Sequence, residues 1–266
     1  MSDEFLSNGY GKVLMSLFRM DNGSVSFGGI KAVRDVSFSV EEGEVFSIIG
    51  PNGAGKTTLF NLISRLYDCE GGSLHLGNVD FSTTPAHRIA EIGIARTFQN
   101  TELFDHETVL KNLMIGRHVH RRTNLLSEML FLPSVRRQEV AFRQKVEDVI
   151  DLLDLQSYRD QVIANLPYGV RKMVEVARAL CIEPTLLLLD ELSSGLNPEE
   201  TEDLAFQIED INEELGITIL MVEHDMNLVS RASNRVKALA DGALIAIGTP
   251  EEIQNHPEVL RAYLGD

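Results

Sequence analysis

A glycine-rich segment before a Lys-Thr pair is the clearest chemical feature of the sequence. Residues 50–57 read Gly-Pro-Asn-Gly-Ala-Gly-Lys-Thr and fit the pattern G-x-x-x-x-G-K-[ST]. The glycines let backbone N–H groups turn inward around phosphate oxygens, and the helix that follows adds positive potential at its N-terminus. The lysine can reach the terminal phosphates, and the threonine hydroxyl can ligate Mg²⁺. The segment therefore predicts a nucleoside triphosphate site with these candidate residues: Gly50, Asn52, Gly53, Ala54, Gly55, Lys56, Thr57 and Thr58. A tight turn with a surface lysine is the alternative, but it does not explain all the motif positions together.

Two adjacent acids later in the chain complement this segment. Asp190 and Glu191 follow four consecutive leucines, as if a buried strand delivered both carboxylates to its C-terminal edge beside the phosphate loop. We expect Asp190 to hold Mg²⁺, usually through water, and Glu191 to act as the base for the attacking water. A helix start with acidic first-turn residues would explain the charges, but not the leucines before them.

The surrounding pattern predicts the elements that position these groups. Residues 45–49 form a short apolar run typical of a strand buried on both faces, and a helix is expected over residues 57–66. Strands at 185–189 and 217–222 alternate with helices at 198–215 and 226–232, the rhythm of a parallel sheet. A last strand at 243–247 and two short helices that begin at Pro250 and Pro257 complete the chain.

Two other regions depart from this rhythm. Residues 24–40 alternate between apolar and polar side chains around a Gly-Gly turn, which predicts a half-exposed antiparallel sheet. Residues 100–166 are mostly of helical pattern, with helices expected at 109–115 and 136–153. The fold class is therefore α/β, a phosphate-loop core with a mostly parallel sheet, an antiparallel β subdomain and an inserted helical subdomain at about residues 100–178. Residues 1–21 show no period and are left as an N-terminal extension of the domain at 22–266.

Composition narrows the class further. Hydrophobic residues make up 44% of the 266, which excludes disorder as the main state. Forty acidic against 24 basic side chains give a charge of -16, which argues against nucleic acid as a partner. Cys69 and Cys181 show no metal-ligand spacing and indicate a reducing compartment. No apolar run approaches the length of a membrane span, and the start lacks a signal-peptide pattern, so we expect a chain that stays in the cytosol.

Four weaker signals sharpen the interpretation when they are taken together. Gln99 lies at the junction between sheet and helical insert, where it could sense the terminal phosphate or the metal. Residues 166–170, Leu-Pro-Tyr-Gly-Val, precede an amphipathic helix expected at 171–182, so their amides could meet an anion. Residues 194–197 follow the acid pair, and His224 follows the next strand. Each of these signals alone is more often an ordinary surface residue or a helix cap.

In this order and spacing, the motifs resemble those of the ATP-binding subunits of ABC transporters, over residues 24–265. The resemblance implies an ATPase with ATP and Mg²⁺ as its cofactors, and catalytic roles for Lys56, Glu191 and His224. By the same resemblance Phe27 stacks on adenine, Gln99 contacts the metal beside Thr57 and Asp190, and 166–170 is the signature motif. The implied nucleotide contacts of the signature and of the D-loop at 194–197 are these: Tyr168, Gly169 and Asn197.

A finer match is to the branched-chain amino acid importer subfamily. It rests on Phe-Gly-Gly at 27–29, a basic insert at 117–137, Gly-Leu-Asn-Pro at 195–198, Val-Glu-His-Asp-Met at 222–226 and Tyr-Leu-Gly at 263–265. The resemblance implies an importer for branched-chain amino acids or related small solutes. Its implied partners are a second ABC ATPase subunit, identical or related, two membrane permeases and, indirectly, a solute-binding protein outside the membrane. The implied location is peripheral, on the cytoplasmic inner face of the cell membrane.

Other interpretations stay open at this point. The chain could serve a different cargo, or be a soluble ABC-type ATP switch not coupled to transport; a kinase with a similar phosphate loop explains fewer of the motifs. Pro167 stands where most ABC relatives have Ser, so we expect weakened closure of the signature over a partner's nucleotide. The basic insert is either a solvated helical face or a contact with the membrane surface or a membrane-embedded partner.

Overall fold

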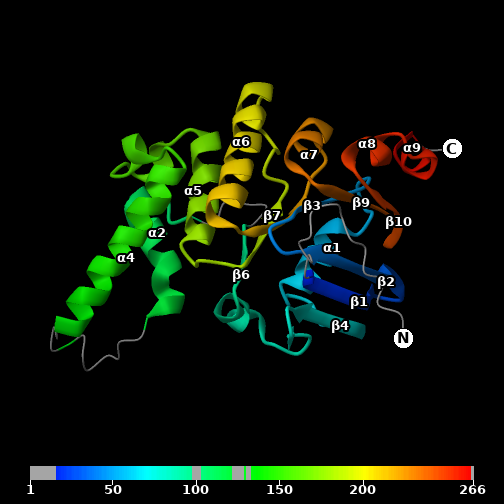
Figure 1. Cartoon of the computed structure of the whole chain (residues 1–266), viewed down its shortest axis with the longest axis horizontal. Helices are drawn as coiled ribbons and strands as arrows, with labels where there is room; N and C mark the ends of the chain where they lie inside the picture. Colours follow the sequence, from blue (N-terminus) through cyan, green and yellow to red (C-terminus); the bar gives the residue numbers. More distant parts are fainter. Residues whose placement is uncertain (1–15, 98–102, 122–128, 130–132, 265–266) are drawn as a thin grey trace, which may run out of the picture.

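The computed structural model describes residues 16–97, 103–121, 129 and 133–264. Six strands in these residues form one sheet in the order β10-β9-β3-β8-β7-β6 (Figure 1). Parallel pairs join β6 (Ile94–Arg96), β7 (Leu186–Asp190), β8 (Thr218–Val222), β3 (Val45–Ile49) and β9 (Arg235–Ala240). Only the edge strand β10 (Ala243–Gly248) runs antiparallel, against β9. The sheet thus brings the C-terminal ends of β3, β7 and β8 to one edge.

The central strands are buried on both faces, as their continuous apolar runs predicted. Alternate residues of β3, such as Val45 and Ile49, join one hydrophobic core with α5 (Tyr168–Leu180), α6 (Pro198–Leu215) and α7 (Met226–Ala232). The intervening Phe46 and Ile48 join a second core with α1 (Lys56–Ile63) and the antiparallel sheet. The predicted strands and helices at 45–49, 198–215 and 226–232 are confirmed at these bounds.

A second sheet of four antiparallel strands has the order β2-β1-β4-β5. It contains β1 (Ser16–Phe27), β2 (Ile30–Glu41), β4 (Gly71–Leu76) and β5 (Val79–Asp80), and η1 (Ala86–Ile92) follows it. Strand β1 begins at Ser16, inside the segment 1–21 that was left without an assigned element, and Phe18 and Met20 of that segment are fully buried. Register shifts near Gly23 interrupt the alternation of β1, which hid the strand in the sequence.

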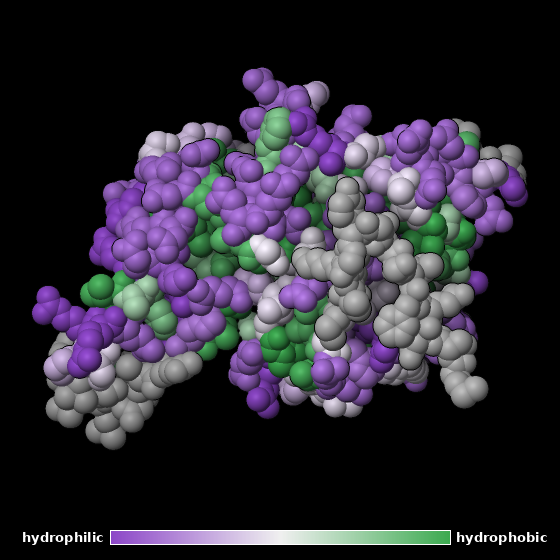
Figure 2. All heavy atoms as spheres, in the orientation of Figure 1, coloured by the Kyte–Doolittle hydropathy of each residue, from purple (hydrophilic) through white to green (hydrophobic). Residues whose placement is uncertain are grey.

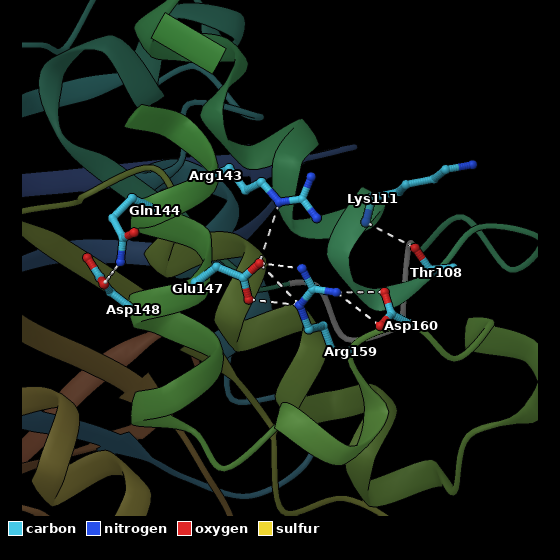
Figure 3. A network of polar contacts seen from close by, with 8 residues as sticks. All are labelled: Thr108, Lys111, Arg143, Gln144, Glu147, Asp148, Arg159 and Asp160. Carbon is cyan, nitrogen blue, oxygen red and sulfur yellow. Dashed lines mark hydrogen bonds and ion pairs between the residues drawn. The ribbon is translucent and has the colours of Figure 1, made fainter. Parts of the chain in front are cut away.

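The helical insert lies between β6 and β7. It contains α2 (Val109–Gly116), η2 (Arg117–His120), α4 (Pro133–Leu152), η3 (Gln156–Tyr158) and η4 (Ile163–Asn165), and it ends in α5. Figure 1 shows these helices grouped on the side of the molecule away from β1 and α9 (Pro257–Leu264). Arg159 fixes α4 to the loop that leads toward the signature, because its Nε donates to Glu147 Oε2 at 2.8 Å (Figure 3). This hydrogen bond lowers the pKa of Glu147.

Part of the basic insert has a structural role. Arg117 is 5% exposed, and it pairs with Glu183 at 2.9 Å and donates to Cys181 O at 2.8 Å. His120 Nε2 lies 2.7 Å from Ile182 O, and Lys145 pairs with the same Glu183. These residues therefore join α2, α4 and the end of α5, and neither predicted alternative describes Arg117. Most of residues 122–132 of the insert lie outside the described part of the chain.

The C-terminal segment packs beside β10 and carries α8 (Pro250–Gln254) and α9 (Pro257–Leu264), so both predicted proline-led helices are confirmed. Hydrophilic side chains cover most of the visible face of α6 in Figure 2. Within the residues that the structure describes, no helix is both long and apolar enough to cross a membrane. Both cysteines are free, and burial raises the pKa of Cys181 to about 12, which fits an inert thiol.

Candidate nucleotide site

The phosphate loop connects β3 to α1, and its shape depends on glycine at Gly55. The φ of Gly55 is 96°, and a Cβ at this position would collide with the carbonyl oxygen of Ala32 on β2. The turn between β9 and β10 supports the loop from the other side, since Gly242 N donates to Ala54 O at 3.0 Å. The loop is therefore held between both sheets before any nucleotide arrives.

Lys56 lies inside the curve of this loop. Its side chain is buried, and Nζ donates to Gly50 O at 2.7 Å and to Pro51 O at 3.2 Å. Burial lowers the pKa of Lys56, while the nearby charges of Glu191 and Asp190 act in the opposite direction. The structure thus brings the predicted lysine and the predicted acid pair within electrostatic reach of one another at one sheet edge.

The acid pair stands at the end of β7. Asp190 pairs with Val222 of β8, and its carboxylate is almost fully buried against Arg96, with Oδ2 2.6 Å from the guanidinium. Burial raises the pKa of Asp190, and Arg96 opposes this effect. Glu191 turns the chain out of the sheet with a φ of 49°, and its N–H donates to Val222 O at 2.9 Å. Such a left-handed conformation costs a non-glycine residue about 1–3 kcal/mol and is typical of functional sites.

The residues here fit a Mg²⁺ ion. Asp190 Oδ1 is buried and has no hydrogen-bond partner among the described residues, so one carboxylate oxygen is left for a ligand or its water. Two other protein ligands were predicted: the hydroxyl of Thr57, which is exposed at the start of α1, and Gln99, which lies outside the described residues. Hard oxygen donors of this kind are what Mg²⁺ prefers, with phosphate and water completing its shell.

The signature motif lies at the start of α5. The helix begins at Tyr168, not at residue 171 as predicted, because Pro167 takes the N-cap position and leaves the amides of Tyr168 and Gly169 in the first turn. Tyr168 is 43% exposed, and a Cβ on Gly195 would lie only 3.0 Å from its ring, so the signature packs on the segment after the acid pair.

The other predicted site residues lie at different distances from this centre. His224 is exposed two residues beyond the end of β8, and β8 is the neighbour of the strand that ends in Asp190. Phe27 is 45% exposed at the end of β1, where it makes an edge contact with Tyr67. The side chain of Asn197 caps α6, accepting from Glu200 N at 3.0 Å. Gln99 lies outside the described residues.

Comparison with known proteins shows the family. A model of the ABC transporter family matches residues 33–194. The chain belongs to this family. A second family model, described as branched-chain amino acid ATP-binding cassette transporter, matches residues 243–266 of the cassette.

Relatives and solved structures agree with this assignment. The cassette is 40% identical over 243 residues to the high-affinity branched-chain amino acid transport ATP-binding protein BraF of Pseudomonas aeruginosa, covering 91% of this chain and 95% of that protein. It is 39% identical over 240 residues to the corresponding protein LivG of Escherichia coli, covering 90% and 94%. A crystal structure of the ADP conformation of an ABC transporter cassette superposes with a TM-score of 0.83 at 30% identity, covering 95% of this chain and all of that one. The predicted family, fold class and ATPase subunit are thereby confirmed.

Sequence reasoning missed four residues that support the cassette's site. Arg96 binds Asp190, and buried Lys172 on α5 donates to Leu192 O at 2.8 Å and to Glu191 O at 3.3 Å. Glu223 is 1% exposed and accepts from Ser193 N and Ser193 Oγ, at 3.1 and 2.6 Å, which fixes the chain just after the acid pair. The phenol of Tyr263 on α9 accepts from the Gly50 amide. The sequence signal for them was weak: each adjoins or lies within a motif, but its partner is distant in the chain.

Proposed function

We propose that the cassette binds ATP with Mg²⁺ and hydrolyses it to power the import of branched-chain amino acids or related small solutes. The observation that carries the chemistry is the grouping of Lys56, Asp190 and Glu191 at one sheet edge, with one oxygen of buried Asp190 left unpaired. The cargo class rests on the names of the relatives and on the family model that matches the C-terminal segment.

The phosphates would lie over the start of α1. Backbone N–H groups of the loop and the helix N-terminus would meet the β- and γ-phosphates, and Lys56 would exchange its two loop carbonyls for phosphate oxygens. Thr57, Asp190 and Gln99 would hold Mg²⁺, which when bound neutralises charge on the triphosphate. Phe27, which is exposed on the antiparallel sheet, would stack on the adenine.

Hydrolysis would use the two residues at the ends of neighbouring strands. The carboxylate of Glu191 accepts a proton from water as the water oxygen bonds to the γ-phosphorus, and the bond from that phosphorus to the β-phosphate oxygen breaks. The products are ADP and inorganic phosphate. His224 would donate a hydrogen bond to the γ-phosphate, and Lys56 would stabilise charge on the oxygen that leaves.

A second cassette, identical or related, would complete the site. This chain has one phosphate loop and one signature, and the amides of Tyr168 and Gly169 begin α5 at an exposed turn. Two solved cassettes described as dimeric share the fold at 24% identity and TM-scores of 0.72 and 0.73. The pair would act on two permease subunits from the cytoplasmic face of the membrane, with a solute-binding protein delivering the cargo on the other side.

Glu191→Gln tests the chemistry. The amide cannot take a proton, so we expect hydrolysis to fall by about 10²–10⁴-fold, while ATP binding persists and light scattering shows a nucleotide-dependent dimer. Glu199→Gln, an exposed acid in the first turn of α6, is the matched control and should hydrolyse ATP normally. Turnover at the wild-type rate in Glu191→Gln would remove that residue from its role.

Cargo and coupling need the assembled system. The cassette should co-purify with hydrophobic membrane subunits, and its ATPase rate in vesicles should rise when a binding protein loaded with leucine is added. Recovery of a soluble complex without membrane subunits would favour a switch not coupled to transport. Stimulation by a different solute would keep the transport function and change the cargo.

A further inference from the structure

The guanidinium of Arg96 joins the three segments that build the acid half of the site. Arg96 is the last residue of β6, and its Nη2 donates to Asp190 Oδ2 at 2.6 Å. Its Nη1 donates to Asn61 Oδ1 at 2.8 Å and to Ser64 Oγ at 2.7 Å. Asn61 lies on α1, the helix that begins with Lys56, and Ser64 caps the end of that helix. One planar group therefore connects β6, β7 and the helix that follows the phosphate loop.

This connection is shielded from water and directional. The Arg96 side chain is 8% exposed and that of Asp190 is 1% exposed. The fork of a guanidinium fixes its partners in one plane, which the point charge of a lysine cannot do. With Oδ2 held by Arg96, rotation of the carboxylate is restricted, and Oδ1 remains buried without a hydrogen-bond partner in the described part of the chain.

A purely stabilising role does not account for this arrangement. Replacing a buried ion pair by apolar side chains is often neutral or stabilising, so such a pair is weak evidence for stability alone. Groups that orient a metal ligand from behind, in contrast, often change metal affinity by about 10–100-fold when they are removed. The unpaired Oδ1 next to a fixed Oδ2 matches this second kind of role.

We propose that Arg96 is a positioning residue for Mg²⁺: it holds Asp190 so that Oδ1 faces the metal or its bound water, and it ties that carboxylate to the helix after the phosphate loop. This inference rests on the proposed function of the site. In this proposal the orientation of Asp190 depends on Arg96 of β6, a strand that carries none of the predicted site residues.

The test measures the Mg²⁺ dependence of nucleotide binding, not turnover. Wild type, Arg96→Lys and Arg96→Gln are titrated with a fluorescent ATP analogue, first with EDTA and then at increasing Mg²⁺. Arg65→Gln is the matched control, because the Arg65 side chain is also buried and, from the position just after Ser64 at the same end of α1, it binds Thr84 O, Tyr67 O and Asp68. Thermal unfolding of every variant is recorded in parallel.

We expect both Arg96 variants to need about 10–100-fold more Mg²⁺ for half-saturation, with metal-free binding within twofold of wild type. Arg65→Gln should match wild type. An unchanged Mg²⁺ requirement in Arg96→Lys, or an equal loss of binding with and without metal, would overturn the inference. If Arg96→Gln fails to fold, Arg96→Lys alone decides. A wild-type protein that binds no nucleotide with Mg²⁺ would instead refute the proposed function.

Discussion

Lys237 of β9 places a buried amine where the two sheets meet, close to the phosphate loop. It is 1% exposed, its Nζ donates to Ser37 O of β2 at 2.6 Å, and it lies 4.3 Å from the centre of the Phe38 ring. The next residue along β9, Ala238, pairs with Ile49, which immediately precedes the phosphate loop. Burial, assisted by the charge of Arg235, lowers the pKa of Lys237 from 10.5 to about 7.

This shift makes folding stability depend on pH. Between about pH 7 and pH 10.5 the unfolded chain keeps the Lys237 proton that the folded chain releases. The free energy of unfolding therefore rises with pH across this window, by at most about 1.4 kcal/mol per pH unit. The contribution of Lys237 to the free energy of unfolding is complete above about pH 10.5 and is lost as the pH falls toward 7. Below about pH 7 it does not change further. Over the whole window it amounts to about 3–5 kcal/mol.

Lys237→Met removes the titration and keeps most of the side-chain volume. At pH 10 the variant should be less stable than wild type by about 1 kcal/mol, because Ser37 O loses its donor. At pH 7 it should be more stable by about 2–4 kcal/mol, because no amine has to lose its proton or its water. The two stability curves should therefore cross between these pH values.

Urea unfolding followed by circular dichroism at half-unit steps from pH 6.5 to 10 measures this difference. Other groups titrate in the same range, but they are common to both proteins and cancel in the comparison. Lys31→Met, at an exposed position of β2, is the control and should give a flat difference. A flat difference for Lys237→Met as well would refute the reasoning: Ser37 O and the Phe38 ring would then hold the ammonium charged inside the fold.

Three further substitutions test the supports of the site. Lys172→Met removes the donor to Leu192 O and Glu191 O, so kcat for ATP hydrolysis should fall about tenfold while ATP affinity stays unchanged. Lys111→Met, at a surface lysine, is the control. A change in ATP affinity without a change in kcat would contradict this prediction. Pro167→Ser places a good capping residue at the N-cap of α5, so ATPase activity should be equal or higher, and a large loss would show that the proline itself is required. Tyr263→Phe removes the acceptor for the Gly50 amide, so ATP affinity should fall about fivefold while the thermal unfolding midpoint stays near that of wild type. The Tyr158→Phe control should bind ATP like wild type. Unchanged ATP affinity in Tyr263→Phe would show that α9 does not support the phosphate loop.

Local sequence patterns were enough to predict the framework of the site. The phosphate loop is encoded in consecutive residues, and β3, β7 and β8 are continuous apolar runs because both of their faces are covered. The strand β9 was missed because Arg235 and Lys237 give it the composition of a surface segment. Lys237 can be buried in β9 only because it donates to Ser37 O and lies over the Phe38 ring, both in the other sheet. No local sequence pattern predicts these two contacts.

The contacts that position the catalytic groups could not be predicted from the sequence either, because they join residues that are distant along the chain. Arg96 and Asp190 come from different strands, and Lys172 reaches the backbone of Glu191 across the interface between insert and core. Motif spacing gave the residue types needed for phosphate, metal and water. It did not give the residues that hold those groups in place, because their role depends on geometry created by folding.

The charges of the site give a physical reason why a second cassette would be needed to bind and hydrolyse ATP. Lys56 and Arg96 balance Asp190 and Glu191, so this group adds no net positive charge for a triphosphate that is still anionic with its metal. The start of α1 supplies only part of the missing positive potential, and the exposed first turn of a partner's α5, which has no acid in its first turn, could supply more. Each cassette carries a formal charge of -16, so the two cassettes of the proposed pair would repel until the nucleotide provides attraction between them. Cleavage of the γ-phosphate would remove part of that attraction while the repulsion remains, which would favour reopening of the proposed pair after hydrolysis.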